Sequence, residues 1–131
     1  MERDVTADTA ESPAVKGDEP FCYLETVGRV SGRPHTVEMW FATDGMTIYL
    51  MSGGRHRSDW IKNLVKHPNV RVRVGAVTYA GTAGVVEGTP DEQPARQALA
   101  AKYYRWREGP LPNQWTREAL PVAIRLNGVA E

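Results

Sequence analysis

Short segments of alternating apolar and polar residues, joined by glycine-containing turns, constrain this chain more than any other feature of its sequence. Period-two alternation with many β-branched and aromatic residues predicts strands. Most connections are shorter than the dozen or so residues that a parallel crossover needs, so neighbouring strands are expected to run antiparallel. The expected strands are residues 21–27, 35–43, 46–51, 69–75, 77–88 and 120–126.

Two helices are predicted among these strands. Ser58 or Asp59 can cap a helix over 60–67, which Pro68 ends. Residues 89–91, Thr-Pro-Asp, open a longer helix that runs to about residue 106. The fold class that follows is mainly β with two helices, in which six antiparallel strands close into a small barrel and the helices cover its openings.

The chain of 131 residues is long enough for one ordinary domain. Residues 1–20 hold six acids against two bases and few apolar side chains, so we expect a disordered acidic leader there and a folded domain over 21–131. No stretch approaches the roughly 20 apolar residues of a membrane span, so a cytoplasmic protein is predicted. Cys22 is the only cysteine, which excludes an internal disulfide; we expect it buried in a strand, and no metal site is predicted.

The formal net charge is zero, but the charge is unevenly distributed. Because the first 20 residues carry a net −4, the rest of the chain carries +4. Between Arg29 and Arg73 eight arginines and lysines face three acids, and all three histidines fall in the same segment. Such a segment attracts anions.

Two loops in this basic segment have the chemistry of an anion site. Residues 28–34 combine two glycines, a serine and two arginines, and glycine lets backbone N–H groups approach an anion while arginine offers paired donors. Residues 52–58 lead into the N-terminus of the first helix, where anions bind readily. Either loop taken alone is also typical of an exposed turn.

Trp60, Asn63 and His67 share one face of the first helix. An aromatic residue at this spacing usually belongs to the core. The asparagine on the same stripe requires a hydrogen-bond partner if it is buried.

These segments together resemble a known family. Gly28-Arg29-Val30-Ser31-Gly32-Arg33-Pro34, Ser52-Gly53-Gly54, and Trp60-Ile61-Lys62-Asn63-Leu64 followed by Lys66-His67-Pro68-Asn69-Val70 are similar to motifs of the deazaflavin-dependent nitroreductase and quinone reductase family. Trp115-Thr116 and Leu120-Pro121-Val122 look like its closing motif. The resemblance implies a split β-barrel of the flavin-reductase type that binds coenzyme F420, whose phosphate and oligoglutamate tail are polyanionic.

The resemblance also implies which residues bind the cofactor. Its phosphate and tail are expected on the first turn. Its ring is expected along the backbone at the end of the third strand and just after it, with the first helix beside the ring. In that order the residues are Arg29, Val30, Ser31, Gly32, Arg33, Pro34 and His35; Tyr49, Leu50, Met51, Ser52 and Gly53; and Asp59, Trp60 and Asn63.

The function that the resemblance implies is hydride transfer from reduced F420 to a flat electron-poor acceptor such as a quinone or nitroaromatic. Trp106 and Tyr104 are the expected walls of the acceptor pocket, and no catalytic side chain is assigned. The alternatives are an FMN-binding reductase that uses a nicotinamide, a non-catalytic flavin or deazaflavin carrier, and a nucleic-acid binder, for which no motif is present. By analogy with other small split barrels we expect a homodimer.

Overall fold

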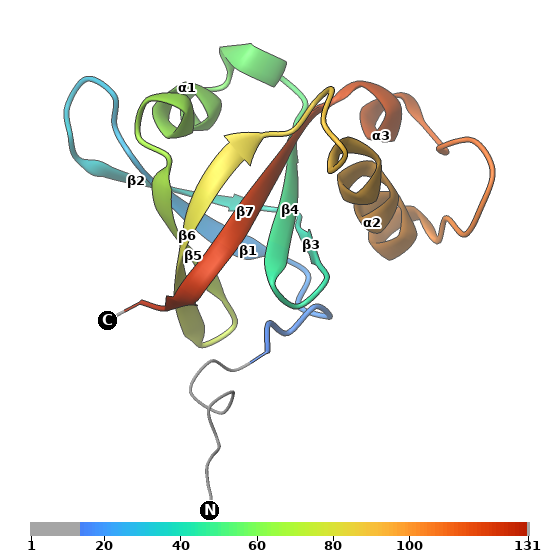
Figure 1. Cartoon of the computed structure of the whole chain (residues 1–131), viewed down its shortest axis with the longest axis horizontal. Helices are drawn as coiled ribbons and strands as arrows, with labels where there is room; N and C mark the ends of the chain where they lie inside the picture. The colour runs from blue at the N-terminus through green and yellow to red at the C-terminus, as the bar shows by residue number, and fades with distance from the viewer. Residues whose placement is uncertain (1–13, 131) are drawn as a thin grey trace, which may run out of the picture.

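The computed structural model describes residues 14–130, and its centre is one curled antiparallel sheet (Figure 1). The strand order across the sheet is β2-β1-β5-β6-β7-β4-β3. Every pair of neighbouring strands is antiparallel. The strands are β1 Cys22–Val27, β2 Pro34–Met39, β3 Ala42–Thr43, β4 Thr47–Ser52, β5 Asn69–Val74, β6 Val77–Val85 and β7 Leu120–Val129.

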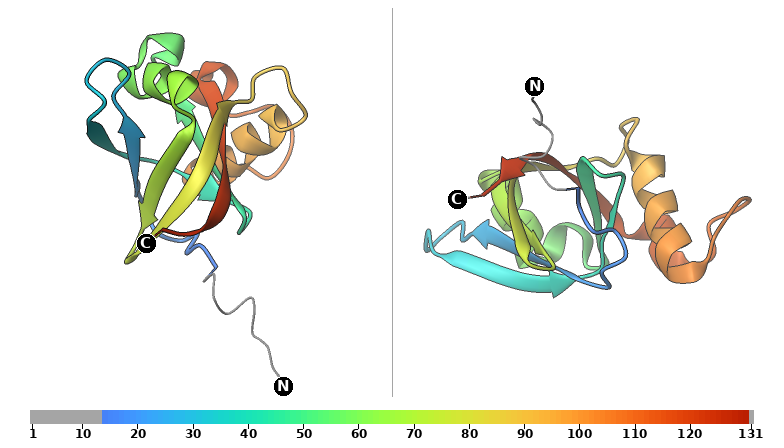
Figure 2. Two further views of the ribbon diagram at one scale, coloured as in Figure 1. Left: turned by 60° about the vertical axis from the view of Figure 1, so that its left-hand side comes forward. Right: turned by 90° about the horizontal axis from the view of Figure 1, so that it is seen from below.

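Three helices and a short 3-10 turn lie around the sheet. Helix α1 (Asp59–Lys66) follows the 3-10 turn η2 (Arg55–Arg57) and covers one end of the curl, next to β1 and β6. Helices α2 (Glu92–Tyr104) and α3 (Gln114–Glu118) pack together beside β3 and β4 (Figures 1 and 2). The predicted class, a mainly β split-barrel fold with an antiparallel sheet, is confirmed.

The strand count is seven instead of the predicted six, because the expected strand 35–43 is divided. Its first part, β2, pairs with β1 at one edge of the sheet, and its second part, β3, pairs with β4 at the other edge. Between them the backbone of Phe41 leaves the ladder, and its N–H and carbonyl bond to the hydroxyl of Tyr103 on α2. The chain therefore crosses from one edge of the sheet to the other within two residues.

Helix α3 is a second difference from the sequence-based expectation, which placed only a loop before the last strand. Asn113 begins this helix: its side chain accepts from the backbone N–H of Thr116, and the Thr116 hydroxyl accepts from the Asn113 N–H. This reciprocal pair is a capping box with asparagine and threonine in place of the usual serine and glutamate. Five residues are too few to show a helical period in the sequence.

Residues 14–20 of the expected acidic leader contact the folded domain, while residues 1–13 lie outside the described residues, so the boundary expected at residue 21 stays a prediction. Val15 is buried in the main core. The ammonium group of Lys102 on α2 donates to the carbonyl of Glu19, and the hydroxyl of Tyr103 donates to that of Pro20. These contacts hold the segment against α2.

Two apolar clusters lie on the two faces of the curled sheet. The inner cluster fills the curl under α1, and the outer one packs α2 against β4, as the period-two alternation of the strands requires. Large inner residues are Leu24, Phe41, Ile48, Leu50, Ile61, Leu64, Val72, Val122 and Ile124; outer ones include Tyr49, Met51 and Leu99. Cys22 is fully buried in β1, as expected, and burial raises the pKa of its thiol to about 12. Within residues 14–130 no helix is long and apolar enough to cross a membrane.

Candidate cofactor and acceptor site

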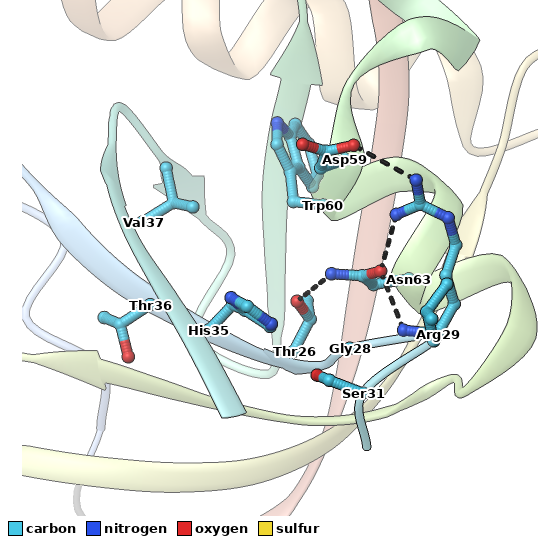
Figure 3. A pocket seen from close by; sticks show the side chains of 11 residues that line it. Thr26, Gly28, Arg29, Ser31, His35, Thr36, Val37, Asp59, Trp60 and Asn63 are labelled. Carbon is cyan, nitrogen blue, oxygen red and sulfur yellow. Dashed lines mark hydrogen bonds and ion pairs between the residues drawn. The ribbon is translucent and has the colours of Figure 1, made fainter. Parts of the chain in front are cut away.

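A cavity of about 490 Å³ lies between the β1–β2 turn, β2 and the start of α1 (Figure 3). It brings together residues that are up to 37 positions apart in the sequence. Seven of the predicted cofactor-binding residues line it: Arg29, Val30, Ser31, His35, Asp59, Trp60 and Asn63.

Glycines in the β1–β2 turn leave room for polar side chains at this side of the cavity. Gly32 has φ +74°, a left-handed conformation that glycine adopts without strain. At Gly28, a Cβ atom would lie 2.7 Å from the Ser31 hydroxyl oxygen and 2.8 Å from Nε2 of His35. Only glycine leaves room there for these two polar side chains to approach the backbone.

Asn63 is the partner that joins α1 to this turn. Its Oδ1 accepts from the backbone N–H of Arg29 at 3.1 Å and from Nη1 of Arg29 at 2.9 Å. Its Nδ2 donates to the hydroxyl of Thr26 at 3.2 Å. The buried asparagine that the sequence left without an evident partner is therefore satisfied, and it holds the turn in place.

The guanidinium of Arg29 is already engaged on one side of the cavity. Besides Asn63 it contacts the Asp59 carboxylate, with Nη2 at 3.2 Å from Oδ1 (Figure 3). Arg33 differs, because among the described residues its guanidinium has no hydrogen bond or ion pair; its backbone N–H donates to the Ser31 hydroxyl and its carbonyl accepts from the Gly28 N–H. Arg33 therefore offers the less compensated charge for an anion. Gly32 and Arg33 in the turn, and Pro34 at the start of β2, do not line the cavity.

Residues 49–53, in β4 and the loop after it, were predicted to line the cofactor ring. Their side chains do not line the first cavity. Leu50 lies in the inner core, and the Tyr49 hydroxyl donates to Asp44 at 3.3 Å. Burial, together with the nearby charges of Asp44 and Asp91, raises the pKa of Tyr49. The Ser52 hydroxyl bonds to the Arg55 carbonyl at 3.0 Å and to the Ser58 hydroxyl at 2.7 Å. Contact with a cofactor through the backbone of 49–53 stays a prediction.

A second cavity, also of about 490 Å³, is lined by methionine and aromatic side chains. We call it the aromatic cavity; its walls are Met39, Trp40, Met51, Tyr104 and Trp115. The Trp40 ring stacks on Tyr103 at 4.2 Å between centroids, and Trp115 meets Trp40 edge-on at 5.6 Å.

Of the two residues predicted for the acceptor pocket, only Tyr104 lines the aromatic cavity. The Trp106 indole lies apart and donates to the carbonyls of Gly109 and Pro110. Sequence reasoning noted the Trp115-Thr116 pair but did not place it in a pocket. The missed signal was Asn113 three residues before Thr116, which is the start of the helix that carries Trp115.

The two cavities lie along one strand. Val37 lines the first and Met39 the second, and residues two apart on a strand face the same side. Ligand pockets are typically concave and lined by apolar side chains with a few placed polar groups, which is the character of the first cavity. Within residues 14–130 no three His, Cys, Asp or Glu side chains gather as a metal site.

Comparison with known proteins identifies the family. The sequence profile of the F420H(2)-dependent quinone reductases matches residues 4–127. The chain belongs to this family and is an F420-dependent reductase. No curated protein sequence matches the chain.

Solved structures share the fold at low sequence identity. A proposed 5-nitroimidazole antibiotic resistance protein from Bacteroides thetaiotaomicron has TM-score 0.72 and 15% identity, over 96% of this chain and 84% of its own. A conserved hypothetical protein from Mycobacterium tuberculosis has TM-score 0.72 and 21% identity, over 95% and 88%. A protein named F420 reductase has TM-score 0.62 and 20% identity, over 87% and 92%.

Polar side chains of the first cavity fit an anionic group. Ser31 and His35 lie beside Gly28 in its wall, and Arg29 keeps N–H donors beyond those used by Asn63 and Asp59. Arg33, in the same turn but outside the lining, has a guanidinium without an ion pair among the described residues. The fit is to phosphate or carboxylate oxygens, which accept from such donors.

Proposed function

We propose that this protein reduces flat, electron-poor compounds such as quinones or nitroaromatics. The anionic part of the cofactor would be held at the β1–β2 turn and the acceptor in the aromatic cavity. The observation that carries this proposal is the alignment of the two cavities along one face of β2, through Val37 and Met39. When bound, reduced F420 supplies the hydride.

The residues of this chain bind and orient the cofactor and the acceptor, and they exclude water from the space between them. Ser31 and His35 in the cavity, with the neighbouring charge of Arg33, bind the anionic part, and Asn63 keeps the β1–β2 turn fixed to α1. Neither Trp40 nor Trp115 makes an indole N–H hydrogen bond within residues 14–130, so both donors are available to a carbonyl or nitro oxygen.

Protons for the reduced acceptor come from solvent under this proposal. The aromatic cavity opens to solvent at Trp40 and Tyr104, which remain 37% and 38% exposed. No ionised side chain lines its walls. Solvent can therefore reach an acceptor in this cavity, and the one wall residue with a hydroxyl is Tyr104.

Cofactor choice is tested by titrating the protein with oxidised F420 and with FMN under the same conditions. We expect tighter binding of F420, because the polyanionic tail gains from the basic turn that FMN's single phosphate uses only in part. Tighter binding of FMN would favour the alternative reductase that uses a nicotinamide.

Turnover is tested by anaerobic stopped-flow absorbance with reduced F420 and menadione. Bound reduced cofactor should be oxidised faster than the free cofactor; slower oxidation on the protein would indicate a carrier instead.

Trp115→Ala should raise the KM for menadione several-fold, roughly 1 kcal/mol of lost contact. Trp106→Ala is the matched control and should leave KM unchanged, because its indole bonds only within its own loop.

We also propose a homodimer that covers strand β2. This strand is at the edge of the sheet, and five of its six residues are exposed. An edge strand with unpaired backbone groups readily pairs with another chain. Light scattering during size-exclusion chromatography should give twice the chain mass, and a monomer at micromolar concentration would contradict this proposal.

A further inference from the structure

The helix that carries Trp115 is too short to be stable by itself. Helix α3 has five residues, and isolated helices of that length do not form in water. Trp115 nevertheless occupies a defined place: it forms a wall of the aromatic cavity, and a Cβ on Gly53 would lie 3.6 Å from its indole ring. The orientation of this wall therefore depends on what anchors α3 at each end.

Two arginines from other elements anchor the C-terminal end of α3. Nη1 of Arg96, on α2, donates to the carbonyl of Thr116 at 3.1 Å and to that of Ala119 at 2.9 Å. Nη1 of Arg55, in η2, donates to the carbonyl of Glu118. These are carbonyls that the end of a helix leaves without intrahelical partners. Arg96 also contacts Sδ of Met51, another wall of the aromatic cavity, at 3.9 Å.

Both arginines share one carboxylate, that of Glu87 in the loop between β6 and α2. Nη2 of Arg55 lies 2.6 Å and 2.7 Å from its two oxygens, and Nη2 of Arg96 lies 3.7 Å from Oε2. The Arg96 side chain is only 3% exposed, so its charge depends on nearby carboxylates, of which Glu92 is the other at 3.0 Å. Arg55 is held at φ +54°, which a non-glycine residue adopts only under local constraint.

We propose that Glu87 is a positioning residue for the acceptor site. By pairing with Arg55 and Arg96 together, it holds both guanidinium groups on the end of α3 and so sets the position of Trp115. This inference rests on the proposed function only in the identity of the cavity's ligand. The geometry of the Arg55–Glu87–Arg96 cluster does not depend on it.

The experiment compares Glu87→Gln with Glu87→Asp, and uses Glu108→Gln as the control. Glutamine removes the charge and keeps the shape, whereas aspartate keeps the charge. Glu108 is exposed, and it makes no hydrogen bond or ion pair with the described residues. The first readout is the indole N–H resonances in a nitrogen–proton correlation spectrum, which needs no ligand.

Glu87→Gln should shift or broaden the Trp115 resonance and leave the Trp106 resonance in place as an internal reference. Glu87→Asp should give a smaller change, and Glu108→Gln none. An unchanged Trp115 resonance in folded Glu87→Gln would overturn the proposal. If Glu87→Gln does not fold, Glu87→Asp decides it by the same resonance, since its shorter side chain must still move Trp115.

The second readout is tryptophan quenching by menadione without reduced cofactor. Glu87→Gln should weaken menadione binding about fivefold, a loss typical of a displaced contact group, with F420 affinity changed less than about twofold. If the wild type and Glu87→Gln bind menadione with equal affinity, the positioning role of Glu87 is overturned, but the acceptor site is not. Failure of the wild type to bind menadione would instead overturn the acceptor site, and with it this role for Glu87.

Discussion

Arg29 and Arg33 belong to the same turn, but their side chains have different surroundings. Arg33→Ala should weaken F420 binding by about 1.5 kcal/mol, the lower end for a charged hydrogen bond, without changing the melting temperature of the free protein. Arg29→Ala should weaken binding and also lower the melting temperature, because its guanidinium joins Asn63 and Asp59. Fluorescence titration and thermal denaturation measure the two effects, with Arg107→Ala as an exposed control. Equal melting temperatures for both variants would show that the Arg29 contacts contribute no stability.

Gly28 lines the same cavity, and its lack of a side chain leaves the space that Ser31 and His35 occupy. In Gly28→Ala the new Cβ would lie within 2.9 Å of Ser31 and His35, so both side chains must move. Since these are the ends of mobile side chains, the free energy of unfolding should change little. F420 affinity should fall by roughly 1 kcal/mol as the two donors are displaced. Unchanged affinity would mean that neither side chain contacts the cofactor.

At the start of α2, Glu92 is expected to make the free energy of unfolding depend on pH. The backbone N–H of Gly88, and then the Arg96 guanidinium, hold the pKa of Glu92 below its ordinary value. A carboxylate with a lowered folded-state pKa stabilises the protein above its unfolded pKa, and this contribution is lost as pH falls through the folded value. Glu92→Gln should therefore reduce the free energy of unfolding at pH 7, by less than about 1 kcal/mol because the group is partly solvated. The difference from wild type should shrink at pH 3, as measured by urea denaturation. A constant difference across this range would contradict the assignment.

The β6–β7 pair contains an irregularity at which glycine is required. The register shifts between Ala80 and Gly81, and a Cβ on Gly81 would lie 2.6 Å from Ile124 and 2.9 Å from the Arg125 carbonyl oxygen. Because one of these neighbours is backbone, Gly81→Ala should destabilise the fold by about 1–3 kcal/mol in chemical denaturation. Gly84→Ala on the same strand is the control, since its Cβ would meet nothing within 4 Å. Equal stability of the two variants would show that the strands separate easily at this point.

For the whole molecule, the two cavities along β2 should respond differently to salt. The first is lined by charged groups on a basic turn, while the aromatic cavity has no ionised side chain. F420 affinity should therefore fall as NaCl rises from 50 to about 500 mM, because screening shortens the reach of exposed charges. Menadione affinity should stay nearly constant in the same titrations. A parallel loss of both affinities would mean that the two ligands do not occupy separate cavities.

Much of the fold could be predicted from local patterns. Alternation in residues such as 69–74 defines strands, Pro68 ends the first helix, and short turns require antiparallel pairing. The glycine-rich turn at 28–34 and the Trp60–Asn63 helix face also pointed to the correct family. Each of these signals lies within a few neighbouring residues, so it can be read without knowing which segments meet.

What only the tertiary structure decided depends on contacts between distant segments. The strand expected at 35–43 breaks because Phe41 bonds to Tyr103, 62 residues further on. Arg29 is partly neutralised because α1 brings Asp59 to it, and Trp115 becomes a cavity wall because Arg55 and Arg96 hold a five-residue helix. Local sequence determined the strands, turns and motif of this protein. The walls of its aromatic cavity and the partly neutralised charge of Arg29 were decided by long-range hydrogen bonds and ion pairs, which leave no periodic signal in the chain.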